Sequence, residues 1–209
     1  MALHSVAVQD VTMTAASHAA IRPLVWLILA LPGLWIGGRW LLTPDAYGYG
    51  HAIGDTGDWA AWLLMLTLAV TPIRLAARRS AVAKWLVRHR RDLGVASFVY
   101  AASHTVAYLW KKGAGEALAE LSTDYIWAGW AALALFVPLA VTSNDASMRW
   151  LKRGWKRLHR LVYPATLLVF LHWVWSAFDP TTAWIHVGIM AVIVSVRLWL
   201  EWSQRRSRA

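Results

Sequence analysis

Long apolar segments separated by short polar connections form the main pattern of the chain. Each segment is close to the ~20 residues with which a helix crosses the hydrocarbon core of a bilayer. The segments run about 23–42, 57–74, 93–110, 124–142, 160–178 and 182–200. We therefore predict an all-α integral membrane protein in which residues 21–202 form a six-helix transmembrane bundle.

The two ends of the chain lack this apolar pattern. Residues 1–20 contain several Ser and Thr and no basic region of the kind that starts a secretory signal. We expect them to form a flexible N-terminal tail. Residues 203–209 carry three Arg and are expected to form a basic C-terminal tail.

Basic residues gather on one side of the predicted bundle. The connection after the second segment reads "RLAARRSAVAKWLVRHRR", and the connection after the fourth contains "RWLKRGWKRLHR". On the other side the only basic residues are Arg39, Lys111 and Lys112. Because Lys and Arg favour cytoplasmic loops, we predict that the N- and C-termini are cytoplasmic.

Composition narrows the kind of partner and the kind of site. The chain is 58% hydrophobic and only 15% charged, which is not typical of a soluble domain. Its net charge of +10 sits in short runs between apolar segments, so the lipid bilayer is a better partner than nucleic acid. The absence of Cys excludes thiolate metal sites and thiol nucleophiles. The eight His residues are then the main candidates for chemistry.

His104 and His172 are expected to lie at similar depth, because the third and fifth segments run in the same direction. Two neutral imidazoles from separate helices of a bundle can ligate a haem iron. The alternative is a pair of interhelical hydrogen bonds. The matched depth favours haem, and an ionisable residue inside a membrane is a functional candidate by default.

His159 raises the question of a second haem. It precedes His172 by thirteen residues, a rise of ~20 Å along a helix, but an ideal helix would place the two on different faces. Pro164 lies between them and could rotate one end through a kink. His89 is the candidate partner on the third segment, although a solvated histidine in a basic connection is the alternative. The candidate contacts for the haem propionates are Arg90, Arg91, Arg157 and Arg160. These arginines already have an explanation as topology signals.

Several stretches resemble one known family. These are "TGDWA", "LTLAVTPIR", "RRDLGVASFVYAASH", "TSNDASMRW" and "WKRLHRLVYPATLLVFLHW". They are similar to the haem-binding membrane subunits of bacterial periplasmic methionine-sulfoxide reductases, the MsrQ family, within the ferric-reductase-like transmembrane domain superfamily. The resemblance covers about residues 23–200, and the "TSND" turn followed by "LHRLVY" and a later histidine is its most specific part.

The resemblance implies a multi-pass b-type haem protein of the bacterial inner membrane. Such a subunit would take electrons from the quinone pool or a cytoplasmic flavin reductase. It would pass them to a periplasmic molybdopterin subunit that reduces methionine sulfoxide in proteins. By position, the family's histidine ligands match His104, His159 and His172. FMN is implied by the resemblance alone, since no residue identifies a flavin site.

The sequence thus predicts an electron-transfer subunit that is not itself the catalytic subunit, with one haem or two. A first alternative is a transmembrane reductase of ferric iron or another external acceptor, which would need a separate electron donor. A second alternative is a small transporter or membrane scaffold without redox function. Paired broken helices in inverted repeats would support a transporter, and the sequence shows none.

Overall fold

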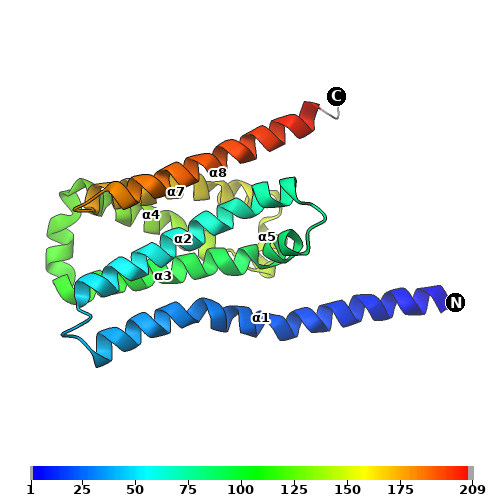
Figure 1. The fold of residues 1–209 in the computed structure, drawn as a ribbon, viewed down its shortest axis with the longest axis horizontal. Helices are drawn as coiled ribbons and strands as arrows, with labels where there is room; N and C mark the ends of the chain where they lie inside the picture. Colours follow the sequence, from blue (N-terminus) through cyan, green and yellow to red (C-terminus); the bar gives the residue numbers. More distant parts are fainter. Residues whose placement is uncertain (1, 207–209) are drawn as a thin grey trace.

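Helices account for almost all of the chain, as expected where every backbone polar group must be satisfied away from water. The computed structural model describes residues 2–206, with side chains from residue 21 onward, and this part of the chain contains no strand. Figure 1 shows the helices side by side. In order they are α1 (Ala2–Leu42), α2 (Tyr49–Ala76), α3 (Ala81–Ala119), η1 (Glu120–Ser122), α4 (Asp124–Val141), α5 (Asp145–Leu151), α6 (Arg153–Leu158), η2 (His159–Leu161), α7 (Val162–Ser176) and α8 (Thr181–Arg206).

Four of the helices are long and apolar enough to cross a membrane: Ile21–Leu42 of α1, and α2, α4 and α8. They coincide with the first, second, fourth and sixth predicted segments. The third and fifth segments lie in α3 and α7, and their spanning stays a prediction. α7 has 15 residues, fewer than the ~20 that cross a hydrocarbon core. Four such helices make the chain a multi-pass membrane protein.

Exposed apolar side chains on the outer helices fit a lipid environment. On α1 and α8 these include Leu24, Leu27, Ile28, Leu31, Val192, Leu198 and Trp199. A surface of this kind would be an aggregation hazard in water, whereas lipid solvates it at no cost. The outward faces of both helices are therefore suited to the bilayer.

The basic connections meet at one end of the bundle. α1 begins and α8 ends there, and the α2–α3 connection and α5 lie beside them (Figure 1, right). We call this the basic end, since it carries the basic stretches of residues 74–91 and 149–160. The connections α1–α2, α3–α4 and α7–α8 lie at the opposite end. The basic connections thus gather at one end of the bundle, in agreement with the charge bias of the sequence.

The core is built on two helix pairs, α2 with α3 and α4 with α7. One buried cluster joins the first pair to α1, with Leu63, Val70 and Leu93 among its members. A second cluster joins α2 to the second pair and to α8 through Leu64, Leu68, Phe136, Phe170 and Met190. α2 contributes to both clusters and so holds the two pairs together.

Tyr100 fastens α1 to this core. Its hydroxyl donates to the Leu29 carbonyl at 2.8 Å and accepts from the Gly33 backbone N–H at 2.8 Å. Leu29 and Gly33 have the spacing of an ordinary helical hydrogen bond, so the hydroxyl is inserted into the ladder of α1. A Cβ at Gly33 would lie 3.3 Å from that hydroxyl oxygen. The absence of a side chain at Gly33 therefore leaves room for the Tyr100 hydroxyl.

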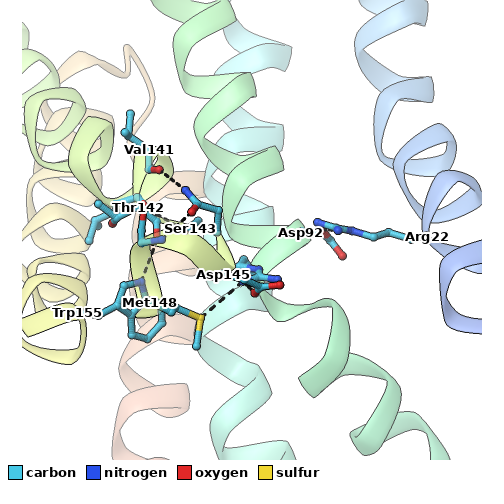
Figure 2. Close-up of polar contacts among 12 residues, drawn as sticks. Arg22, Asp92, Val141, Thr142, Ser143, Asp145, Met148 and Trp155 are labelled. Atoms are coloured by element: carbon cyan, nitrogen blue, oxygen red, sulfur yellow. Dashed lines mark hydrogen bonds and ion pairs between the residues drawn. The ribbon is translucent and has the colours of Figure 1, made fainter. Parts of the chain in front are cut away.

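The "TSND" turn, residues 142–145, connects α3, α4, α5 and α6 at the basic end (Figure 2). Asn144 caps α5 by accepting from the Ser147 N–H at 2.8 Å. The Trp155 indole donates to the Thr142 carbonyl at 2.9 Å. Asp145 pairs with Arg91 of α3 at 2.5 Å, and that guanidinium holds the pKa of the Asp145 carboxyl below its ordinary value. The turn therefore fixes where α6 lies relative to α3 and α4.

The chain around Pro164 does not form one kinked helix. A 3₁₀ turn separates two α-helices before this proline. α6 ends at Leu158, the 3₁₀ turn η2 holds His159, and α7 starts at Val162. Pro164 is the third residue of α7, where its missing N–H has no partner to lose. The segment from His159 to His172 is thus not a single α-helix, so the angle between the two side chains on an ideal helix does not apply.

The predicted tails lie largely within helices. α1 includes residues 2–20, which the sequence assigned to a flexible tail, and their flexibility stays a prediction. α8 continues to Arg206, into the predicted C-terminal tail. Residues 207–209 lie outside the described part of the chain.

The Tyr100 insertion predicts a measurable loss of stability. Tyr100→Phe removes both interhelical hydrogen bonds and should lower the free energy of unfolding by about 1–3 kcal/mol. Thermal unfolding of the purified protein in detergent measures this. Ser103→Ala is the control, because Ser103 is exposed on α3 and bonds only within its own helix. Equal stability of the two variants would contradict the anchoring role.

Candidate functional site

Two histidines face each other inside the bundle. His104 of α3 and His172 of α7 have ring centroids 6.0 Å apart and planes at 90°. The two residues come from different helix pairs, so the pairs meet at these rings. The structure therefore brings together the two histidines for which the sequence suggested a shared depth.

A backbone carbonyl holds each ring in place. Nδ1 of His104 lies 2.9 Å from the Ile53 carbonyl oxygen of α2, and Nδ1 of His172 lies 2.6 Å from the Tyr125 carbonyl oxygen of α4. A carbonyl only accepts hydrogen bonds, so each Nδ1 must carry the hydrogen. In a neutral imidazole the lone pair is then on Nε2. Both rings thus have the tautomer that a metal ligand needs.

Two glycines make room for these rings. Gly57 follows Ile53, and Gly129 follows Tyr125, by four residues in each case. A Cβ at Gly57 would lie 3.1 Å from His104 Nδ1, and one at Gly129 would lie 2.9 Å from His172 Nδ1. Any other residue would push the imidazole away from its carbonyl. The glycines are therefore part of the site although they carry no functional group.

The rings border a cavity of about 480 Å³. This is within the range of about 300–1,000 Å³ in which ligand pockets usually fall. Its walls are mainly apolar, with Ala61, Leu64, Leu133, Phe136 and Val169 among them. An apolar cavity with two inward-facing imidazoles suits a flat apolar group that carries a metal.

Polar groups gather where the cavity approaches the end opposite the basic end. The Tyr108 hydroxyl and Lys112 both donate to Glu120, each at 2.6 Å. Lys112, and then Tyr108, lower the pKa of the Glu120 carboxyl. Gly113 has φ of 77°, a conformation that favours glycine, and it lets α3 bend before η1. Lys112 is the one cationic side chain among the described residues that line the cavity.

Comparisons with known proteins agree with this architecture. The family profile described as "Ferric reductase like transmembrane component" matches residues 56–170. The chain is 38% identical over 201 residues to the "Protein-methionine-sulfoxide reductase heme-binding subunit MsrQ" of Xanthomonas euvesicatoria pv. vesicatoria (strain 85-10), covering 94% of this chain and 89% of the relative. The chain belongs to the MsrQ family.

A more distant member gives the same result. The relative of the same name from Polaromonas naphthalenivorans (strain CJ2) is 30% identical over 203 residues, covering 91% of this chain and 90% of the relative. No solved structure gives a significant match. The family resemblance inferred from the sequence motifs is therefore confirmed, over most of the length of these relatives.

His159, which the family resemblance matched to a ligand, lies outside the cavity. Thr142 donates its hydroxyl hydrogen to the Pro138 carbonyl at 2.6 Å. The 3.1 Å contact between His159 Nε2 and the same hydroxyl therefore requires Nε2 to donate. Trp155 stacks on the ring at a centroid distance of 3.9 Å. His159 thus has the opposite tautomer from His104 and His172, with Nε2 occupied by a protein hydrogen bond.

His89 is buried and is not a solvated histidine. Its Nδ1 lies 3.1 Å from a carboxylate oxygen of Asp92, which pairs with Arg22 of α1 at 2.9 Å. Trp85 packs on the ring at a centroid distance of 4.7 Å. Among the described residues, no contact joins His89 to His159. The structure therefore does not place these two histidines as a pair.

The four arginines expected at propionates are absent from the described lining of the cavity. Arg90 donates to the Thr67 carbonyl at 3.1 Å, and Arg91 pairs with Asp145. Arg157 and Arg160 are exposed. Lys112, which the sequence offers only as a topology signal, is the cation that the fold places at this cavity.

His186, on α8, has both ring nitrogens engaged. Its Nδ1 lies 2.7 Å from the Thr182 carbonyl oxygen, and its Nε2 accepts from the Trp62 indole at 3.1 Å. Trp173, which lines the cavity, packs on the ring at a centroid distance of 4.7 Å. His186 therefore packs against the wall of the cavity with both ring nitrogens engaged.

Sequence reasoning missed Gly57, Gly129 and the two carbonyls. A carbonyl has no sequence signature, because every residue carries one. The glycines did leave a signal, since glycine inside a helix costs about 1 kcal/mol relative to alanine and needs a reason. Aligning each glycine with a histidine required the helix pairing, which only the fold supplies.

The close approach at Gly129 predicts a reversal of the usual effect of a Gly→Ala change. Gly188→Ala in α8, where a Cβ meets nothing within 4 Å, should stabilise the protein by roughly 0.5–1 kcal/mol. Gly129→Ala should instead destabilise it by about 1–3 kcal/mol, because the new methyl group breaks the His172 hydrogen bond. Thermal unfolding compares the two. An increase in stability at both positions would contradict the packing described.

Proposed function

We propose that the chain is a membrane b-type cytochrome that holds one haem between His104 and His172. The observation that carries this proposal is the pair of imidazoles with Nδ1 fixed by a carbonyl, both bordering one apolar cavity. Metal-ligating histidines usually donate the N–H of their other ring nitrogen to an acceptor such as a backbone carbonyl. The names of the relatives, which describe a heme-binding subunit, support the same assignment.

The ring spacing fits a six-coordinate iron. Bonds from a metal to imidazole nitrogen are about 2 Å long, so two opposed imidazoles on one metal have centroids about 6 Å apart. The observed centroid distance is 6.0 Å. Simple interhelical hydrogen bonding between the rings fits less well, because both Nδ1 hydrogens already go to carbonyls and two Nε2 acceptors cannot bond to each other.

When bound, haem would supply a one-electron redox centre. The protein's own residues would set its environment. The carbonyls of Ile53 and Tyr125 keep both imidazoles neutral and oriented, and the apolar walls exclude water. Lys112, at the polar end of the cavity, is the candidate to face an acidic substituent of the group. Two histidine ligands would leave the iron no open position for a substrate, which suits electron transfer and not bond-making chemistry.

We infer a route for electrons from the charge bias. With the basic end cytoplasmic, the cavity lies toward the periplasmic side of a bacterial inner membrane. The quinone pool or a cytoplasmic flavin reductase is the donor that this orientation suggests. The acceptor would be a periplasmic molybdopterin subunit that reduces methionine sulfoxide; the names of the relatives support the methionine-sulfoxide reductase system as the partner. The chain would then be an electron-transfer subunit and not the catalytic one.

Absorption spectra test the haem and its ligands. The purified protein should show a Soret band and, after reduction, the α-band of a six-coordinate b-type haem. His104→Ala and His172→Ala should each abolish the six-coordinate spectrum and most of the bound haem. His51→Ala, which changes an exposed histidine at the start of α2, should leave both unchanged. Absence of haem from the unmodified protein would refute the proposal.

The number of haems gives a separate prediction. His159→Ala and His89→Ala should keep one haem per chain, because His159 Nε2 bonds to Thr142 and His89 is enclosed by Asp92 and Trp85. Haem extracted from known amounts of each variant measures the ratio. Two haems in the unmodified protein, with one lost in either variant, would contradict this prediction and support the second haem site that the sequence suggested.

Reoxidation distinguishes the proposed acceptor from the alternative reductase. The reduced protein should be reoxidised rapidly by a periplasmic methionine-sulfoxide reductase subunit supplied with methionine sulfoxide. Fast reoxidation by a ferric chelate alone would favour a transmembrane ferric reductase instead.

A further inference from the structure

Side chains from four elements gather at the polar end of the histidine cavity. The lining there includes Tyr49 of α2, Tyr108 and Lys112 of α3, Glu120 of η1 and Tyr125 of α4. Tyr108 and Lys112 follow His104 on α3 by four and eight residues, a rise of ~6 Å and ~12 Å along the axis. The polar end is therefore about two helical turns from the His104 ring.

Glu120 is held from two sides. One carboxylate oxygen accepts from the Lys112 ammonium and the other accepts from the Tyr108 hydroxyl, each at 2.6 Å. Glu116 also approaches the Lys112 ammonium, but at 3.9 Å, and its side chain is 68% exposed. Glu120 is therefore the carboxylate that fixes the position of Lys112.

The Lys112 ammonium keeps donors for a further group. An ammonium has three N–H donors, and among the described residues Glu120 alone accepts from it at hydrogen-bond distance. The hydroxyls of Tyr49 and Tyr125 likewise have no acceptor within the described part of the chain. Asp58 is the other carboxyl group in the lining, and none of the described cations pairs with it. The polar end thus offers hydrogen-bond donors around one cation, which suits an occupant that carries a carboxylate.

We propose that the Lys112–Glu120 pair sets the reduction potential of the bound haem, an inference that rests on the haem site of the proposed function. The remaining donors of Lys112 bind an acidic substituent of the haem. Glu120 acts through Lys112 and is a positioning residue. It also supplies a negative charge that offsets the ammonium.

The sign of each effect follows from the charge change on reduction. One electron from the donor adds one negative charge to the bound group, and no bond forms or breaks. A nearby ammonium stabilises that added charge, whereas a nearby carboxylate destabilises it. The side chains of Lys112 and Glu120 are 37% and 32% exposed, so salt screens both charges in part and leaves the signs unchanged.

Potentiometric titration of the haem in the purified full-length protein tests the inference. Lys112→Gln removes the positive charge and should shift the midpoint potential to more negative values. Glu120→Gln leaves the ammonium without its carboxylate and should shift the potential to more positive values. The double variant K112Q/E120Q removes both charges and should return the potential close to that of the unmodified protein. A purely structural role of the pair would not produce this return.

Two neighbouring residues provide matched controls. Lys111→Gln removes an exposed positive charge next to Lys112. Glu116→Gln removes an exposed carboxylate that lacks the 2.6 Å contact. Neither residue lines the cavity, so each variant should leave the potential close to the unmodified value.

Haem retention gives a second measurement. Transfer of haem to an excess of apomyoglobin should be about tenfold faster from Lys112→Gln, because a hydrogen bond to a charged group is lost. Lys112→Arg keeps the charge and should keep both the haem and the unmodified potential. If Lys112→Gln holds no haem, the sign of the Glu120→Gln shift decides.

Three results would overturn the inference while haem stays bound to the unmodified protein. These are equal potentials in Lys112→Gln and Lys111→Gln, a Glu120→Gln shift that is absent or negative, and a double variant that moves further from the unmodified potential than either single variant. Absence of haem from the unmodified protein would instead refute the proposed function itself.

Discussion

The hydrogen bond from each imidazole Nδ1 to a carbonyl of the adjacent helix is the interaction on which the site depends. It fixes three properties at once: the neutral tautomer, the orientation of the ring and the availability of Nε2. It also brings each ring so close to Gly57 or Gly129 that a Cβ at either position would crowd the imidazole. Both rings border the cavity, and the two hydrogen bonds keep each ring against its own carbonyl.

The same arrangement occurs twice. In the first pair, α2 supplies the carbonyl and the glycine and α3 supplies the histidine; in the second pair, α4 and α7 have the same roles. The carbonyl precedes its glycine by one helical turn in both. Two helix pairs that face each other thus place two equivalent imidazoles at one cavity. Under the proposed function, repetition of one local contact would supply both ligands of a haem iron.

The sequence predicted most of the helices and the meeting of His104 with His172, because apolar segment length and direction set depth in a membrane. It could not predict the contacts of His159. These depend on a 3₁₀ turn and on the Thr142 hydroxyl, whose hydrogen is already donated to the Pro138 carbonyl. It also gave His89 two equally simple explanations, and neither included Asp92 and Arg22, because the salt bridge joins residues seventy positions apart. Side-chain partners of this kind depend on tertiary packing, which periodicity does not encode.

The motifs that carry the family resemblance lie partly far from the cavity, and this has a physical reason. Residues 142–145 contact Arg91, Trp155 and His159 at the basic end, and none of them lines the cavity. Their contacts determine where α6 ends and where α7 begins. Because α7 rises about 1.5 Å per residue, a shift of its start by one residue would change the depth and the facing direction of His172. The turn at one end of the bundle thus positions His172 near the other, which explains how a signature outside the cavity can belong to the same function.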